Sequence, residues 1–430
     1  MLQVLKRKLE KREFLSSLLM ILSGTILGQA IFFLSSFVIT RIYTPDDFGT
    51  AGIYSALISF VLVVASLRYE LVIPMVKDDK GALNALALSF LMVCFISICT
   101  MLTLFFLKDV LLQIPNFKTI SNFFWLLPIS IFFMGSYQVL NYWAIRKKFF
   151  SAISQTKVTQ SIGQVLSYII IGLKAYGPVG LIIGDIIGKA AGIRTLIKKG
   201  LKNSNISANI SCGEMWRIMK RYKSFPLIST WSSIFNIAAL QIPPIVMVFI
   251  YSQGIIGWFV LSQKVIMAPL GIIGQAVSQV YLGQLSKGIR ENKSGLEKFF
   301  LNVVIKLSII GLIPIVIILA IGPWIFEIGF GEKWVEAGVY SQYLAPMYLA
   351  YFVAFPLSQT LSVLELQKHQ LAWDIFRFLG VLFIFYLAKT LVLEPKINLL
   401  YYGIFMAVSY AILLTLIYFK LKKLNTITKA

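Results

Sequence analysis

The chain has 430 residues, of which 58% are apolar and only 13% are charged, and its formal net charge is +22. Soluble domains contain about 25% charged residues, so this composition excludes a soluble globular protein and an intrinsically disordered chain. The chain has only three cysteines, which excludes a disulfide scaffold.

Apolar runs bounded by charged residues follow one another along the chain, and most have the length of about 20 residues that a membrane-spanning helix needs. The first half holds six: Leu15–Ile39, Gly49–Val76, Gly81–Leu107, Phe123–Ile145, Val158–Leu173 and Gly177–Ile197. The second half holds six more: Phe225–Ile250, Ile255–Leu285, Phe299–Gly322, Tyr340–Leu364, Leu371–Ala388 and Asn398–Phe419. The sequence therefore predicts an all-α polytopic membrane protein with about 12 transmembrane helices.

The longest polar stretch, Lys198–Ser224, separates the two sets of runs. We therefore expect a six-helix lobe over residues 1–200, a cytoplasmic basic linker over 201–224 and a second six-helix lobe over 225–430.

A short internal repeat supports this division. Ile42-Tyr43-Thr44 and Gly49 match Ile250-Tyr251-Ser252 and Gly257 at a single offset of 208 residues. Because each lobe holds an even number of helices, the two repeats share one orientation, as in transporters with parallel repeats.

Lysine and arginine are distributed unequally between the alternate connections that join the runs. The connections that share a side with the two termini hold 27 of these residues, and the opposite set holds 7. Because basic residues accumulate on the cytoplasmic side, we expect both termini in the cytoplasm. Most of the net charge is thus an orientation signal, so no nucleic-acid partner is needed to explain it.

Some ionisable side chains fall inside the predicted runs, where a charge is costly and usually faces a cavity or a partner. Asp185 precedes Lys189 by one helical turn, so a salt bridge within the sixth run is expected. For Arg194 and Arg377 we expect snorkelling to the cytoplasmic headgroups. The full set is Arg68, Glu70, Asp185, Lys189, Arg194, Lys264, Lys306, Asp374 and Arg377.

Lys264 and Lys306 lie deeper in their runs and have no acidic partner on their own helix, so they are candidates for lining a water-filled cavity. Lys264 also begins a stripe of small and polar residues on one helical face. The stripe continues with Ala268, Gly271, Gln275 and Ser278. Similar stripes occur in the first, second and fifth runs, so the sequence predicts an aqueous path lined by both lobes.

The sixth run carries glycines at intervals of four residues, namely Gly180, Gly184, Gly188 and Gly192. Such a face predicts close packing against a neighbouring helix.

Features that would indicate catalysis are missing from the sequence. It contains no Cys/His or carboxylate cluster with metal-ligand spacing and no GxxxxGK[ST] phosphate-binding loop. We therefore expect neither an enzyme nor a cofactor or metal.

Several stretches resemble the polysaccharide transporter family, the Wzx-type O-antigen and capsule flippases of the multidrug/oligosaccharidyl-lipid/polysaccharide (MOP) superfamily. In the first half they are RIYTPDDFG at 41–49, LRYELVIP at 67–74 and WAIRKKF at 143–149. In the second half they are LSQKV at 261–265 and IGQAVSQV at 273–280. The matches cover roughly residues 1–290, and the last third agrees mainly in helix count and hydropathy.

The resemblance implies a two-lobed fold like that of multidrug exporters in the MOP superfamily. It also implies a function, because such proteins move undecaprenyl-pyrophosphate-linked oligosaccharide units across the bacterial inner membrane. A cation-lined cavity between the lobes and alternating access would follow, and a polysaccharide polymerase and a chain-length regulator would be possible partners.

The same resemblance assigns roles to particular residues. Arg68, Glu70, Arg146 and Lys264 fall inside matched motifs, as does Gln275, whereas the candidate role of Lys306 rests on its depth alone.

Other functions stay open at this point. An ion-coupled multidrug exporter of the same superfamily would usually need an acid in the first or seventh run, and neither contains one. A peptidoglycan lipid-precursor flippase would use closely similar chemistry. A major-facilitator carrier is disfavoured because its G-x-x-x-D-R-x-G-R-R turn is absent, and a non-transporting scaffold for glycan assembly would not need four polar stripes.

Overall fold

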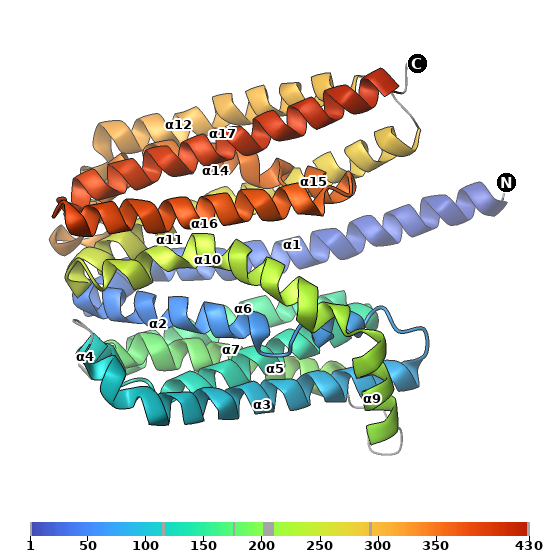
Figure 1. The fold of residues 1–430 in the computed structure, drawn as a ribbon, viewed down its shortest axis with the longest axis horizontal. Coiled ribbons are helices and arrows are strands. Elements are labelled where there is room, and N and C mark those ends of the chain that lie inside the picture. The colour runs from blue at the N-terminus through green and yellow to red at the C-terminus, as the bar shows by residue number, and fades with distance from the viewer. Residues whose placement is uncertain (1, 114–116, 175–176, 201–209, 292–294, 428–430) are drawn as a thin grey trace. The chain divides into compact units, whose positions relative to one another are not determined.

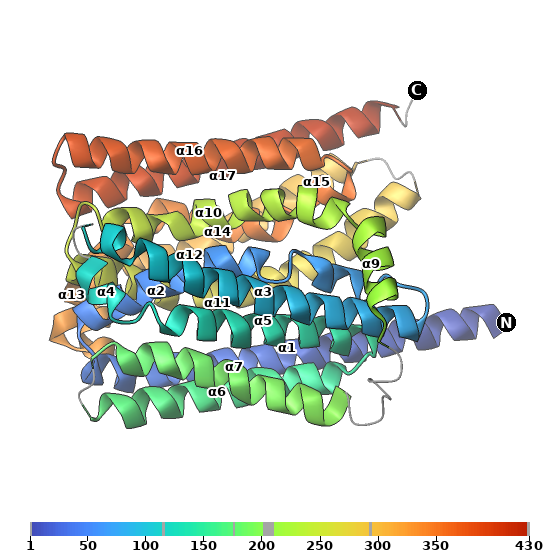
Figure 2. The same cartoon turned by 60° about the horizontal axis from the view of Figure 1, so that its bottom comes forward.

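The computed structural model describes residues 2–113, 117–174, 177–200, 210–291 and 295–427. Within these ranges the regular structure is helical and contains no strand, as Figures 1 and 2 show. The prediction of an all-α protein is confirmed. The first part of the expected linker, residues 201–209, lies outside the described residues.

Every predicted apolar run coincides with a helix or with a series of short helices. The first half contains α1 (Leu2–Ile42), α2 (Pro45–Val64), η1 (Tyr69–Val72), α3 (Asp79–Leu112), α4 (Phe117–Ser121), α5 (Leu126–Arg146), α6 (Phe150–Gly172), α7 (Val179–Gly200) and α9 (Cys212–Arg221). The second half contains η2 (Phe225–Ser229), α10 (Thr230–Met247), α11 (Gln253–Arg290), α12 (Leu296–Phe330), η3 (Glu332–Trp334), α13 (Val335–Tyr343), α14 (Ala345–Ala354), η4 (Phe355–Leu357), α15 (Thr360–Val363), α16 (Gln367–Thr390) and α17 (Pro395–Ile427).

Within the described part of the chain, 7 helices are long and apolar enough to cross a membrane: α1, α2, α3, α11, α12, α16 and α17. The remaining predicted runs coincide with helices that are shorter or more polar. One of these, α6, has 23 residues, which is long enough to span, but it carries the polar stripe from Thr156 to Ser167.

Two prolines divide the tenth predicted run, Tyr340–Leu364. Pro346 lies in the first turn of α14, and Pro356 lies in the first turn of η4. Proline has no backbone N–H and is tolerated in the first turn of a helix, where that donor would have no partner. The run is therefore a series of short helices, α13 to α15, and not one continuous helix.

The helices cluster into two compact units. The first unit comprises Met1–Tyr43 and Ile53–Ile234, and the second comprises Thr44–Gly52 and Phe235–Ala430. The first turns of α2 thus belong to the second unit, although they precede most of the first unit in sequence. The lobe limits predicted from the sequence, at residues 200 and 225, remain a prediction.

The second predicted run is interrupted near its C-terminal end. α2 ends at Val64, and Leu67 and Arg68 then adopt positive φ angles of 51° and 65°. Residues with a Cβ rarely adopt this left-handed conformation. The chain continues as the 3-10 turn η1, so Glu70 lies on this turn and not on the continuous helix that the sequence predicts.

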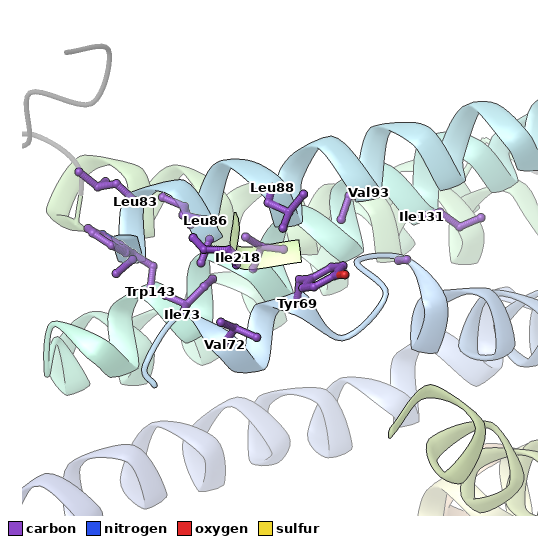
Figure 3. Close-up of a cluster of buried hydrophobic side chains, with 14 residues drawn as sticks. Tyr69, Val72, Ile73, Leu83, Leu86, Leu88, Val93, Ile131, Trp143 and Ile218 are labelled. Carbon is purple, nitrogen blue, oxygen red and sulfur yellow. The ribbon is translucent and has the colours of Figure 1, made fainter. Parts of the chain in front are cut away.

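A buried apolar cluster surrounds η1 in the first unit (Figure 3). It contains Tyr69 and Val72 of η1, Leu83 of α3, Trp143 of α5 and Ile218 of α9. The break after α2 is therefore packed against three helices, which hold its unusual backbone conformation in place.

The glycine face of α7 packs against α6, as the sequence predicts. A Cβ at Gly184 would overlap the Tyr168 ring, and a Cβ at Gly188 would lie 3.0 Å from the backbone oxygen of Gln160. Only a residue without a side chain permits this approach of the two helices.

Repeat-related residues occupy matching places in the two units. The hydroxyl of Tyr43 donates to the backbone oxygen of Tyr168 in α6 at 2.7 Å. The hydroxyl of Tyr251, 208 residues later, donates to the backbone oxygen of Leu393 just after α16 at 3.0 Å. α6 and α16 coincide with the fifth predicted run of each half, so the two tyrosines bind equivalent helix ends.

A second matched pair joins α2 to α5 and α11 to α14. Tyr54 and Ser130 share a hydroxyl hydrogen bond of 2.7 Å, and Ser262 and Tyr348 share one of 2.8 Å. Tyr54 and Ser262 are again 208 residues apart, with the tyrosine and the serine exchanged. The weak sequence repeat thus corresponds to matching hydrogen bonds in the two units.

α2 and α11 cross at repeat-related glycines, and this crossing lies within the second unit. A Cβ at Gly49 would overlap the backbone oxygen of Gln253, and a Cβ at Gly257 would overlap the backbone oxygen of Pro45. Both pairs, Pro45 with Gln253 and Gly49 with Gly257, obey the offset of 208 residues. The crossing leaves no room for a side chain at either glycine.

Candidate functional site

Glu70 is the centre of a buried polar cluster in the first unit. Its carboxylate is 0% exposed and lies 3.6 Å from the guanidinium of Arg68. It also accepts hydrogen bonds from the hydroxyl of Ser66 and, at 2.9 Å, from the side-chain amide of Gln138 on α5. The Arg68 side chain is 23% exposed, so its charge can be reached from outside while the carboxylate cannot.

Arg146, at the end of α5, binds the segment between η1 and α3. Its guanidinium donates to the backbone oxygens of Ile73 at 3.1 Å and Asp78 at 3.0 Å. It also pairs with the carboxylate of Asp79 at 3.1 Å, and Lys147 reaches the same carboxylate at 2.7 Å. Because these acceptors occupy its donors, the geometry favours a structural role for Arg146 over the predicted substrate-binding role.

Asp185 and Lys189 lie close together on α7, but they do not form the predicted ion pair. Asp185 instead accepts hydrogen bonds from the hydroxyl of Tyr168 at 2.5 Å and from the amide of Gln164 on α6. Lys189 donates to the side-chain oxygen of Gln160 at 3.4 Å, and its ammonium lies 5.3 Å from the ring centre of Tyr137. The glycine face brings α6 so close that its amides and tyrosine satisfy both charged groups across the interface.

The polar stripe of α11 faces open space in the second unit. Lys264 and Gln275 are exposed, and a Cβ at Gly271 would meet nothing within 4 Å. On another face of the helix, a Cβ at Gly274 would lie only 2.8 Å from Phe355. The Lys264 ammonium lies 5.9 Å from the ring centre of Phe48. Lys264 and Gln275 are therefore placed where a polar ligand could reach them.

Lys306 is also exposed, but its surroundings on α12 differ from those of Lys264. The residues one turn further along, Ile309 and Ile310, are 59% and 52% exposed. Such an apolar surface is typical of a lipid-facing helix, where a lysine extends its charge towards the headgroups. This environment favours snorkelling over the cavity-lining role that its depth suggested.

Asp374 and Arg377 form a buried ion pair in the second unit, with a separation of 3.0 Å and side chains that are 2% and 3% exposed. The guanidinium lies 4.3 Å from the ring centre of Trp373, and it donates to the hydroxyl of Tyr410 at 3.4 Å. Asn236 of α10 donates to the Asp374 carboxylate at 3.2 Å. The expectation that Arg377 snorkels to the headgroups is wrong, because its partners hold it inside the helix bundle.

Three partners of these charged groups were not recognised from the sequence: Gln138, Asn236 and Tyr410. Each lies in a predicted apolar run at a position that α-helical periodicity alone does not connect to the charge. The available signal was simply a polar residue inside an apolar run, which indicates a partner without saying which one.

The described ranges contain no group of three or more His, Cys, Asp or Glu side chains that could hold a metal ion.

Solved structures with the same fold are membrane transporters. An inward-facing multidrug resistance MATE family transporter of the MOP superfamily is 14% identical, with a TM-score of 0.74 over 93% of this chain and 95% of that chain. Lipid II flippase MurJ is 13% identical, with a TM-score of 0.71 over 94% of this chain and 89% of that chain. A MOP superfamily transporter from Pyrococcus furiosus is 12% identical, with a TM-score of 0.63 over 96% of each chain. The chain therefore shares the fold of these transporters.

The amino-acid sequence identifies the protein family. The sequence model of the polysaccharide biosynthesis protein family matches residues 38–338, which is more than half of the chain, so the protein belongs to this family. The resemblance found in the sequence motifs is therefore confirmed. No curated protein matches the sequence.

Proposed function

We propose that this protein is a flippase that moves undecaprenyl-pyrophosphate-linked oligosaccharide units from the cytoplasmic to the periplasmic leaflet of the bacterial inner membrane. The units would then enter O-antigen, capsule or exopolysaccharide assembly, with a polymerase and a chain-length regulator as partners. The transport cycle would use alternating access, as expected for a MOP superfamily fold.

The observation that carries the proposal is the open polar stripe of α11. A membrane helix gains nothing from exposing a lysine, a glutamine and a bare glycine to lipid, because each polar group would lose its hydrogen bonds to water. A pyrophosphate would attract the Lys264 ammonium, and sugar hydroxyls would bond to Gln275.

Two further findings support a lipid-linked glycan as the substrate. The description of the family names polysaccharide biosynthesis. One solved structure of similar fold is lipid II flippase MurJ. A lipid-linked substrate needs a polar path only for its head, since its polyprenyl tail can remain in the bilayer.

The three acids within the predicted membrane runs differ in the groups that they contact. Glu70 and Asp374 each face an arginine, whereas Asp185 receives hydrogen bonds from the neutral groups of Tyr168 and Gln164. If the cycle is coupled to an ion or a proton, Asp185 is thus the best placed of the three to exchange it.

Complementation tests the proposal directly. A strain that lacks its own O-antigen or capsule flippase should regain surface polysaccharide when it expresses this protein together with the matching glycosyltransferases. Inverted membrane vesicles should also move a fluorescent undecaprenyl-pyrophosphate oligosaccharide to their inner leaflet. Export of cationic dyes without glycan movement would support a multidrug exporter instead.

A further inference from the structure

α9 separates its apolar and basic side chains onto opposite faces. Met215, Ile218 and Met219 pack into the apolar cluster around η1, and Figure 3 shows Ile218 among the side chains of that cluster. The other face exposes Trp216, whose side chain is 58% exposed, and Lys220. One face therefore fixes the helix to the first unit, and the other is free to contact a partner.

α9 lies across the direction of the long helices of the first unit, such as α3 and α5, as Figures 1 and 2 show. It is tied to the beginning of α3, where the side-chain oxygen of Asn84 accepts a hydrogen bond from the backbone N–H of Ser211 at 2.8 Å. Asn84 is only five residues after the start of α3, which has 34 residues. Because a span of the hydrocarbon core takes about 20 residues, we expect this end of α3, and α9 with it, at the level of the lipid headgroups.

The exposed face of α9 carries an excess of positive charge. Arg217, Lys220, Arg221 and Lys223 are all exposed. The only acid on the helix is Glu214, and Arg217 pairs with it at 2.8 Å. The remaining basic side chains have no carboxylate partner among the described residues, so the face is complementary to an anionic surface.

Trp216 adds an anchor that suits the membrane interface. The ammonium of Lys220 lies 5.8 Å from the centre of its ring, which pairs an amphipathic aromatic group with a charge one helical turn away. Tryptophan prefers the boundary between headgroups and hydrocarbon.

We propose that the outer face of α9, with Trp216, Lys220 and Arg221, together with Lys223 just beyond the helix, binds the headgroups of anionic phospholipids. The lipid phosphates lie against the basic side chains, and the Trp216 ring enters the headgroup region. This surface is separate from the stripe of α11, so the proposal does not depend on the identity of the transported substrate.

Cys212 provides a native position for a probe, because it is exposed at the start of α9, one turn before Trp216. The full-length protein carrying Cys94→Ser and Cys99→Ser is labelled at Cys212 with a fluorophore and placed in lipid nanodiscs. Quenching is compared between headgroup-spin-labelled phosphatidylglycerol and headgroup-spin-labelled phosphatidylcholine. We expect the anionic lipid to quench more strongly at equal content, and we expect the difference to shrink in 1 M salt, where the Debye length falls to about 3 Å.

The double variant Lys220→Gln/Arg221→Gln should lose the preference for phosphatidylglycerol. Each charge removed should lower the affinity for the anionic lipid about fivefold. The matched control Lys287→Gln/Lys298→Gln removes two exposed charges from the second unit and should keep it. Trp216→Ser retains every charge of α9 and should weaken quenching by both lipids. Size-exclusion profiles establish that each variant is folded.

Equal quenching by the two lipids in the parent protein, or an unchanged preference in the Lys220/Arg221 variant, would overturn the proposal. A probe that stays in water in every nanodisc would also overturn it and would leave a protein partner as the occupant of this face.

Discussion

Lys264 and Arg377 are both basic residues inside predicted membrane helices, yet the structure gives them opposite surroundings. Arg377 is 3% exposed and bonded to Asp374, whereas Lys264 is exposed on the open stripe of α11. A charge with buried partners stabilises packing, and a charge on an open polar face is available to a ligand. The two residues therefore call for different experiments.

For Lys264 we expect surface polysaccharide to depend on the charge of the side chain. Lys264→Ala should sharply reduce display, Lys264→Arg should retain part of it, and Lys264→Glu should be worse than alanine because it repels pyrophosphate. The measurement is polysaccharide display in a strain without its own flippase, with the membrane level of each variant checked by immunoblot. Full display from the glutamate variant would remove the electrostatic role of Lys264.

For Arg377 we expect a loss of stability that precedes any effect on transport. Arg377→Ala leaves the Asp374 carboxylate buried without its cation, which costs about 3–5 kcal/mol. The double variant Asp374→Asn/Arg377→Met should recover much of this loss, since neither charge remains. Thermal unfolding of the purified protein in detergent gives the comparison, and an unchanged midpoint for Arg377→Ala would contradict the assignment.

At the scale of single elements, the α6–α7 pair combines two features that the sequence shows separately. The glycine face of α7 and the polar stripe of α6 are both visible in the sequence, but only the structure places them against each other. Gly184 meets Tyr168, and Gly188 and Gly192 meet Gln160. The polar residues of α6 are thereby used within the interface, so this stripe is not part of an open path.

Filling the glycine face should prevent the two helices from meeting. Gly184→Leu and Gly188→Leu would drive side-chain atoms into Tyr168 and the α6 backbone, so we expect a loss of about 1–3 kcal/mol or more and a low yield of monodisperse protein. Gly283→Leu is the matched control, because a Cβ at Gly283 meets nothing within 4 Å. Fluorescence-detected size exclusion reports the yield, and equal yields for all three variants would show that the face is not packed.

The sequence predicts a structural feature well when neighbouring residues determine it and poorly when distant residues do. The positions of the helices follow from hydropathy, which is a local property. Every predicted run therefore coincides with one helix or with a series of short helices. The interruption at Leu67 and Arg68 was missed because neither residue is a glycine or a proline. The turn that follows it is held by a distant residue, Gln138 of α5, which binds Glu70. The partner of Asp185 was predicted wrongly because helical spacing relates only residues of the same helix. The actual donors, Gln164 and Tyr168, lie on α6.

At the scale of the whole chain, membrane topology is the property that the charge distribution predicts most directly. We expect residues 201–224 to face the cytoplasm and Lys333 to face the periplasm, since 27 of the basic connection residues fall on one side and 7 on the other. In a variant without native cysteines, a membrane-impermeant maleimide applied to intact cells should label Lys333→Cys and spare Asn205→Cys. Labelling at position 205 but not at position 333 would show that the orientation is the opposite of the predicted one.

The glycine crossing of α2 and α11 has the form of an isologous contact, in which one surface patch meets a second copy of itself. Gly49 meets Gln253 and Gly257 meets Pro45, so each contact is accompanied by its counterpart 208 residues away. The crossing within the second unit therefore has a local two-fold symmetry, and a side chain added at Gly49 or at Gly257 would meet an equivalent backbone oxygen of the other helix.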